Sequence, residues 1–374
     1  MNLHAARADA TAWPHHGEQA QRAIGGWLLG SVQLSVGPHA GGVAGAIDGN
    51  GRPLYVYPEI TGYYLQWLSW RSLRQSPTPA LAQRAVAAQR WLASWILGPE
   101  PLQTRAYLRA HEADWRNSAL FCFDLAMVLR GVASAAAIGI IEPDPILIER
   151  LFAQLSTLVA ADGEFMACVA PSGVSLPDRW STRRGSFLAK AAAAVLMAAR
   201  VLPQVPARLR AAAEATLAAS IRAAIKTPHE QAHPQLYAVE GAVMLASHPA
   251  VALVLPQFTR QIDGLLSGAT VRSALMEPSA TRGAERLDVV AQVLRVAYLL
   301  RALVPEWSPD PRSLAVMQQF LMRQTAFEGG APFDAAPAAP PYCVWAAMFA
   351  EQALDLARTA SRNVVDREMA AYLV

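Results

Sequence analysis

Residues 41–70, GGVAGAIDGNGRPLYVYPEITGYYLQWLSW, begin as a Gly-rich segment and end as an apolar helix. The DGNG run at 48–51 is typical of a hairpin turn and predicts a short β-hairpin within 38–53. Pro58 suits the first position of a helix, because its missing N–H would have no partner there. Glu59 then falls in the first turn, where the helix dipole favours a negative charge. The stretch therefore predicts a strand-like loop that leads directly into a helix over 58–71.

The same order of long loop, helix, short link and second helix recurs along the chain. First helices are expected over 58–71, 117–134, 185–201, 234–246, 286–304 and 342–359, with starts 49 to 68 residues apart. Five have a clear second helix, expected over 79–97, 145–160, 206–225, 250–266 (starting late or kinking at Pro256) and 311–325. The sixth has two candidate partners, one over 18–30 and one over 364–373.

Six helical hairpins with their long loops on one side predict an all-α fold, the (α/α)6 toroid, with short β-hairpin-like loops on one face. An open solenoid of hairpins is the alternative. A second strand-like hairpin is expected in the loop over 161–184, around a Pro-Ser-Gly turn. We expect residues 1–374 to form a single toroid domain, with 1–16 as a flexible N-terminal extension.

The composition limits the classes of partner. Apolar residues make up 53% of the 374 residues and charged residues 16%, against roughly a quarter in an average domain. The net charge is +3 and no basic run is present, so we expect no nucleic-acid partner. The N-terminus lacks the apolar segment of a signal peptide, and every long apolar stretch is broken by charges, so we expect no membrane span and a cytoplasmic location.

Three cysteines, Cys122, Cys168 and Cys343, are too few for a disulfide framework, and we expect Cys122 and Cys343 to be small core residues. No P-loop, no GxGxxG that opens a helix and no CxxC pair occurs, so no cofactor is expected. The run HEQAH at 229–233 matches the zinc-protease pattern HExxH. That pattern needs a continuous helix, and Pro234 disfavours a helical His233, so we interpret it as a chance match and expect no metal.

Five segments carry a resemblance to a known family. They are YPEITGYY at 57–64, FCFDLAMVLRG at 121–131, RWSTRRGSFLAKAA at 179–192, HPQLYAVEG at 233–241 and RLDVVAQVLR at 286–295. The first resembles the YPE[IV]TGY signature of bacterial (α/α)6-toroid proteins, several of which are linked to polysaccharide or other carbohydrate metabolism. The resemblance implies a six-hairpin toroid. It implies no particular reaction, because this scaffold holds hydrolases, lyases, epimerases and inactive relatives.

In such a ring, polar residues at the starts of the inner helices face one cavity. The candidate catalytic residues are those that could act as acids or bases there, namely Glu59, Glu240, Asp288, His233 and Tyr237. His233 and Tyr237 are four residues apart and share a helix face. Structural alternatives stay open, since Glu59 also complements the helix dipole and His233 also suits a helix cap.

The candidate substrate-binding residues are aromatic or polar side chains near the same helix starts. Arg beside Trp in the loop over 161–184 suits recognition of a carboxylate or sugar, and equally suits a solvated loop. Asp288, Gln292 and Arg295 form a polar stripe that needs partners in a ligand or in neighbouring helices. The candidates are Tyr57, Tyr63, Tyr64, Trp115, Asp178, Arg179, Trp180, Arg184, Lys190, Arg286, Gln292, Asp334 and Tyr342. Asp124 and Arg130, within an apolar helix, are instead expected to make buried structural pairs with other helices.

These features favour a carbohydrate-active or related small-molecule enzyme that works in the central cavity, with hydrolase, lyase and epimerase chemistry all open. One alternative is a non-catalytic toroid that binds a glycan, a peptide or a partner protein in a biosynthetic pathway. Another is a cyclase-like enzyme on an apolar substrate. The expected partner is a small molecule or glycan, and association with a partner protein or a second copy of the chain stays open.

Overall fold

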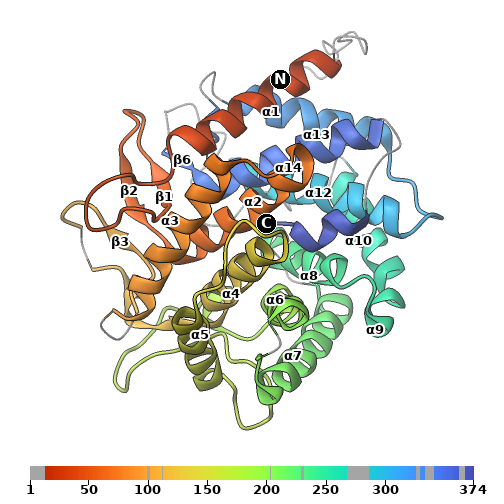
Figure 1. The fold of residues 1–374 in the computed structure, drawn as a ribbon. Helices are drawn as coiled ribbons and strands as arrows, with labels where there is room; N and C mark the ends of the chain where they lie inside the picture. The colour runs from red at the N-terminus through yellow and green to blue at the C-terminus, as the bar shows by residue number, and fades with distance from the viewer. Residues whose placement is uncertain are drawn as a thin grey trace.

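The computed structural model of this chain describes residues 13–98, 102–111, 113–202, 204–228, 231–267, 286–325, 329–332, 341–361 and 367–374. Within these residues an inner ring is formed by the helices α2 (Pro58–Gln75), α4 (Cys122–Ala137), α6 (Leu188–Val201), α8 (Ala232–Met244), α12 (Leu287–Leu303) and α14 (Val344–Ser361). Each inner helix packs on the next and α14 returns to α2, which closes the ring (Figure 1). The predicted (α/α)6 toroid is confirmed, and the open solenoid is wrong.

An outer layer of helices covers the ring. It contains α1 (Trp13–Gly30), α3 (Pro79–Ile96), α5 (Pro145–Thr157), α7 (Ala207–Lys226), α10 (Leu255–Leu266) and α13 (Pro311–Gln324). The short helix α9 (Pro249–Ala252) precedes α10, whose start beside Pro256 agrees with the late start expected there. The N-terminal α1 packs along α14 and so supplies its partner. Residues 13–16, expected in a flexible extension, belong to α1, and residues 1–12 lie outside the described part of the chain.

Glycines set the spacing between neighbouring inner helices. A Cβ atom on Gly62 of α2 would lie 2.6 Å from the Met127 carbonyl oxygen of α4, and one on Gly241 of α8 would lie 2.6 Å from the Ala189 carbonyl oxygen of α6. Such distances allow no side chain, so the two backbones touch directly. This contact requires Gly at both positions and keeps the ring narrow.

The first hairpin lies on the loop side of the ring, as predicted. Strands β1 (Ala44–Ile47) and β2 (Pro53–Val56) pair in antiparallel fashion, and β3 (Ala106–Tyr107) and β6 (Tyr342–Cys343) extend the sheet in the order β3-β2-β1-β6. The turn is closed by the Asp48 N–H, which donates to the Arg52 carbonyl at 2.9 Å. Gly51 adopts φ 76°, a conformation that glycine accepts without strain. The sheet thus joins the starts of α2 and α14.

The second expected hairpin, within 161–184, is wrong. Strand β5 (Cys168–Val169) pairs with β4 (Leu120–Phe121) and not with a returning strand of its own loop. Because residues 120–121 are extended in this pairing, α4 begins at Cys122 and not at 117 as expected; the short 3-10 helix η2 (Trp115–Ser118) precedes it. The rest of the loop forms a turn at Gly173 and a 3-10 helix, η3 (Trp180–Thr182), that faces the ring.

The expectation that Pro234 keeps His233 out of a helix is also wrong. Helix α8 begins at Ala232, so His233 and Pro234 are its second and third residues. The first four N–H groups of a helix have no partner within it, and a proline there removes no hydrogen bond. His229 and Glu230, which complete the HExxH pattern, lie outside the described residues.

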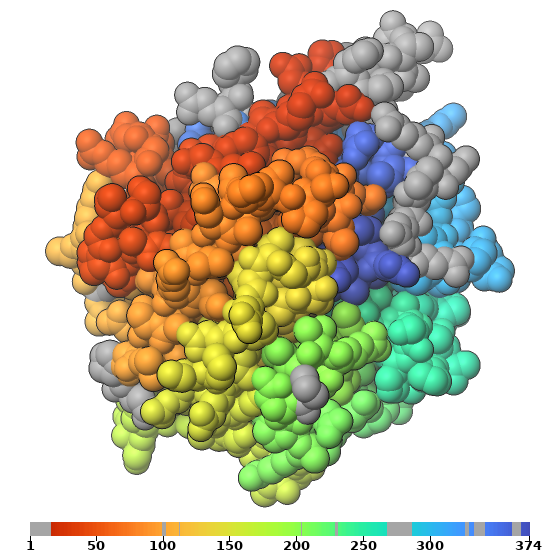
Figure 2. All heavy atoms as spheres, in the orientation of Figure 1, coloured from red at the N-terminus to blue at the C-terminus, as the bar shows by residue number. Residues whose placement is uncertain are grey.

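The C-terminal segment lies at the centre of the ring (Figure 1). Its 3-10 helix η4 (Arg367–Tyr372) stands where an α-helix over 364–373 was expected; residues 362–366 lie outside the described part. The carbonyl oxygen of Val374 accepts hydrogen bonds from Lys190 Nζ at 2.9 Å and Arg295 Nη1 at 2.8 Å. Around it, the described atoms of successive segments meet without a deep opening on this face (Figure 2). Within the described residues, no helix is both long and apolar enough to cross a membrane.

Candidate functional site

A cavity of about 440 Å³ lies at the loop side of the ring. Residues at the starts of all six inner helices line it, together with the loops that precede α4 and α6. The helix starts contribute Tyr57, Glu59, Ile60, Phe121, Phe123, Asp124, Phe187, His233, Tyr237, Arg286, Cys343 and Trp345, and the strands and loops contribute Ala46, Tyr55, Thr104, Arg105, Trp115, Arg116, Arg179, Trp180, Ser181 and Pro341. The toroid therefore brings six separate segments to one site.

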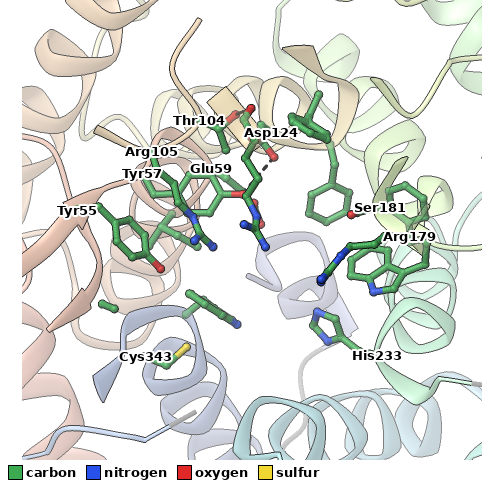
Figure 3. Close-up of a pocket in the computed structure, with 18 of the residues that line it drawn as sticks. Tyr55, Tyr57, Glu59, Thr104, Arg105, Asp124, Arg179, Ser181, His233 and Cys343 are labelled. Atoms are coloured by element: carbon green, nitrogen blue, oxygen red, sulfur yellow. Dashed lines mark hydrogen bonds between the residues drawn. The ribbon is translucent and has the colours of Figure 1, made fainter. Parts of the chain in front are cut away.

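Two carboxyl groups meet in this cavity, Glu59 from α2 and Asp124 from α4 (Figure 3). Burial raises the pKa of Asp124 well above its usual range, and the neighbouring charge of Glu59 raises it further. Burial also raises the pKa of Glu59, while hydrogen bonds from Tyr57 and Asp124 act in the opposite direction. Tyr57 Oη lies 3.5 Å from Asp124 Oδ1. The hydrogen bond between the two carboxyl groups raises the pKa of Asp124 and lowers that of Glu59, which corresponds to a protonated Asp124 that donates to an ionised Glu59.

His233 lies across the cavity from this carboxyl pair (Figure 3). Its Nδ1 is 2.6 Å from Gln292 Oε1, and because an amide oxygen only accepts, Nδ1 carries the hydrogen. Burial lowers the pKa of His233 to about 4, and the Arg286 charge contributes. The ring is therefore neutral at pH 7, and Nε2 keeps a free lone pair, as a general base requires.

Gln292 is held in turn by Glu240. Gln292 Nε2 donates to Glu240 Oε1 at 3.3 Å, so its amide oxygen is left to face His233. Glu240 is fully buried and pairs with Lys190 Nζ at 2.8 Å and with Arg295. Burial alone would raise the pKa of Glu240, but these two cations outweigh it and lower the pKa. Glu240 does not line the cavity, and Lys190, Arg295 and Gln292 contact it in the interior.

Arg286 and Asp288 form a buried pair at the start of α12. Arg286 donates to Asp288 through Nε at 3.0 Å and Nη2 at 2.6 Å, and Trp345 Nε1 donates to the same carboxylate at 3.3 Å. Burial opposes ionisation of Asp288, but the Arg286 charge prevails and lowers its pKa. Arg286 lines the cavity, whereas Asp288 does not. Asp288 is thus a permanent counter-ion of Arg286.

Aromatic rings form much of the cavity wall. Trp180 packs edge-on against Phe187 at 5.1 Å and His233 at 5.7 Å between ring centroids. On the opposite side, the Arg105 guanidinium lies 4.6 Å from the ring centre of Tyr55 and 5.7 Å from that of Tyr57. Flat aromatic faces beside hydrogen-bonding groups suit a ligand that has apolar ring faces and a polar rim.

The predicted site residues fall into three groups. The cavity brings together Glu59, His233, Tyr237, Tyr57, Trp115, Arg179, Trp180 and Arg286. Six are buried and do not line the cavity, namely Tyr63, Tyr64, Lys190, Glu240, Asp288 and Gln292. Three others do not line the cavity. Asp178 pairs with Arg183, and Arg184 pairs with Asp162. Tyr342 packs against Trp27. Asp334 lies outside the described residues. The catalytic and binding roles of these residues stay predictions.

Several lining residues were not among the predicted set, chiefly Asp124, Arg105, Arg116 and Trp345. Asp124 makes the expected buried pair with a neighbouring helix, but it also faces the cavity, because α4 starts only two residues before it. An acidic residue in the first turn of an inner helix is the sequence signal that would have identified Asp124 as a cavity residue. Arg105 and Arg116 lie in an irregular segment with no periodic pattern. Cys343, expected in the core, is buried and also borders the cavity, while Cys122 is buried.

No cluster of three or more His, Cys, Asp or Glu side chains in the described ranges is arranged to hold a metal ion.

Comparisons with known proteins agree with this architecture. No protein-family model and no curated protein sequence matches the chain. Among solved structures, D-mannose isomerase is similar with a TM-score of 0.65 and 13% identity, over 93% of this chain and 99% of that one. Cellobiose 2-epimerase from Spirochaeta thermophila DSM 6192 is similar with a TM-score of 0.63 and 14% identity, over 95% of this chain and 100% of that one. An unsaturated glucuronyl hydrolase specific for heparin is similar with a TM-score of 0.62 and 10% identity, over 94% of this chain and 98% of that one. At these identities the likeness shows a shared fold.

Proposed function

We propose that this chain is a carbohydrate-processing enzyme that moves protons to and from a sugar in the central cavity. Asp124 is the general acid and His233 the general base. The observation that carries the proposal is that both side chains line one cavity, where burial and Glu59 raise the pKa of Asp124, burial lowers that of His233 to about 4, and the contact of His233 Nδ1 with Gln292 leaves Nε2 as the base. Proton transfer by positioned groups of this kind accelerates reactions by roughly 10² to 10⁴.

The aromatic walls and the similar structures support a sugar as the substrate. Tyr55, Trp115 and Trp180 are aromatic residues of the cavity lining. The similar structures include D-mannose isomerase, cellobiose 2-epimerase and an unsaturated glucuronyl hydrolase specific for heparin. Four arginines and two carboxylic acids line the cavity, which does not suit a cyclase that acts on an apolar substrate.

Isomerase or epimerase chemistry fits the geometry better than hydrolysis by two separate carboxylates. Glycosidases of that type keep their two carboxyl groups about 5–10 Å apart, with the sugar between them. Glu59 and Asp124 are instead hydrogen-bonded to each other, and Asp288 is neutralised by Arg286. In the proposed reaction His233 removes a proton from a carbon beside a carbonyl group, and Asp124 protonates the carbonyl oxygen. Glu59 keeps the pKa of Asp124 high.

The test uses D-mannose, cellobiose, D-glucuronate and an unsaturated glucuronyl disaccharide in D₂O, followed by ¹H NMR. An isomerase or epimerase exchanges the C2 hydrogen for deuterium, whereas a hydrolase releases a free sugar without that exchange. Asp124→Asn is expected to lower the rate by about 10² or more with the fold retained. Asp178→Asn, on an exposed loop, is the control. The proposal fails if the wild type converts none of these sugars or if Asp124→Asn matches the wild type.

A further inference from the structure

The charges around the cavity do not balance. Four arginines line it, Arg105, Arg116, Arg179 and Arg286. Arg105 and Arg116 share one counter-ion, Asp114, at 3.5 Å and 3.1 Å. Arg286 is neutralised by Asp288, and the Glu59–Asp124 pair carries one negative charge because it keeps one proton. Four positive charges thus face three negative ones, which leaves a surplus of one cation.

The helix starts add to this surplus. Each inner helix presents its N-terminal end to the cavity, and that end carries roughly half a positive charge. An acidic residue in the first turn offsets this at α2, α4 and α12, but α6, α8 and α14 have none. The cavity is therefore electropositive on the side of α6 and α8, where Arg179 also lies.

Arg179 is the cation without a partner in this balance. Its side chain makes no ion pair with any described residue, although Asp178 and Arg183 on either side pair with each other. The adjoining Trp180 is fixed against Phe187 and His233, which anchors the backbone of Arg179 at the cavity rim. Figure 3 shows its guanidinium directed into the cavity, close to His233. A planar guanidinium binds a carboxylate through two parallel hydrogen bonds.

We infer that the substrate is a sugar that carries a carboxylate, and that Arg179 binds this carboxylate. The inference rests on the proposed function and adds the class of substrate to it. With its carboxylate on Arg179, the sugar ring lies beside Trp180 and His233, and its far edge reaches toward the Glu59–Asp124 pair. A neutral sugar would leave the surplus positive charge of the cavity without a counter-ion.

The experiment compares the binding of D-glucuronate with that of D-glucose, which has the same ring and no charge. Affinities are measured by saturation-transfer NMR and isothermal titration calorimetry at pH 7 and low salt, for the wild type, Arg179→Gln and Arg183→Gln. Arg183 is exposed in the same loop and does not line the cavity, so its variant is the matched control. We expect the wild type to prefer glucuronate by about tenfold or more, Arg179→Gln to lose that preference and Arg183→Gln to keep it.

Each outcome separates this inference from the proposed function. Equal binding of the two sugars by the wild type would overturn the carboxylate inference and leave the proposed function standing. A preference for glucuronate that survives Arg179→Gln would overturn the assignment to Arg179. Failure of the wild type to bind either sugar would overturn the carboxylate inference, while the proposed function would still be decided by the conversion assay in D₂O.

Discussion

Replacing Asp124 by asparagine tests the shared proton without any substrate. In the wild type the folded pKa of Asp124 lies well above its ordinary value, because of burial and the adjacent Glu59. The folded state therefore keeps a proton that the unfolded state has already released. It follows that the free energy of unfolding falls as pH rises from about 4 through the folded pKa. The Asp124→Asn change removes that dependence, since an asparagine side chain does not ionise and its amide can donate to Glu59 at every pH.

The magnitude follows from the charges involved. Two carboxylates about 4 Å apart repel each other by about 4 kcal/mol at an effective dielectric constant near 20, so the doubly ionised pair is strongly disfavoured. Each unit by which the folded pKa exceeds the unfolded one costs about 1.4 kcal/mol at high pH. We expect the stability of Asp124→Asn relative to the wild type to improve by at least about 1.4 kcal/mol between pH 4.5 and pH 8.

The assay is urea unfolding followed by circular dichroism at these two pH values. Asp288→Asn is the matched control, because the Arg286 charge lowers the pKa of Asp288 and the sign reverses. Its carboxylate stabilises the folded state above the unfolded pKa of about 4, and this contribution is lost only below that pH, so the stability difference between Asp288→Asn and the wild type must stay nearly constant between pH 4.5 and pH 8. If the stability difference between Asp124→Asn and the wild type shows no pH dependence, or follows that of Asp288→Asn, then Asp124 holds no proton and cannot be the acid.

Two further predictions concern stability. Gly62→Ala is expected to destabilise the protein by about 2 kcal/mol in urea unfolding, because its Cβ would press on the Met127 carbonyl. Gly264→Ala, whose Cβ would meet no neighbouring atom within 4 Å, should instead stabilise helix α10 by about 0.5–1 kcal/mol. Similar effects of the two changes would contradict the direct backbone contact at Gly62. His233 has a folded pKa of about 4 against 6.5 when unfolded, so stability is lost as pH falls from 6.5 toward 4, by about 3 kcal/mol. His233→Asn should abolish this loss, and an unchanged pH profile would show that His233 is protonated when folded.

The fold could be predicted from the sequence because its signals are local. Pro and Gly mark the ends of helices, and six similar units leave few arrangements that bury all their apolar faces. The helix that pairs with α14 could not be predicted in the same way. Both α1 and the C-terminal segment had the composition to pack on α14, and only the packing of the whole chain decides that α1 does so. The pairing of β4 with β5 is equally non-local. Because of this pairing, α4 starts at Cys122 and not at residue 117 as expected.

The sequence predicts that the site lies at the starts of the inner helices. It does not predict which polar side chains line the cavity and which are buried in the interior. His233 and Glu240 are on the same helix, seven residues apart, which is about 10 Å along its axis. His233 therefore borders the cavity, while Glu240 lies in the interior with Lys190 and Arg295. A sequence shows that both are polar residues on an inner helix. It does not show at which residue of that helix the cavity ends and the interior begins.

This difference in depth divides the charged residues of the ring into two sets with different consequences. The set below the floor is Glu240 with the two cations that pair with it, Lys190 and Arg295; all three are completely buried, and both cations also donate to the carbonyl oxygen of Val374. Removing Glu240 leaves both buried cations without this partner, and breaking a buried pair typically costs about 3–5 kcal/mol of stability. At the rim, Arg179 has no such partner to lose among the described residues. Substitution of Glu240 must therefore act through the fold, and substitution of Arg179 through the ligand.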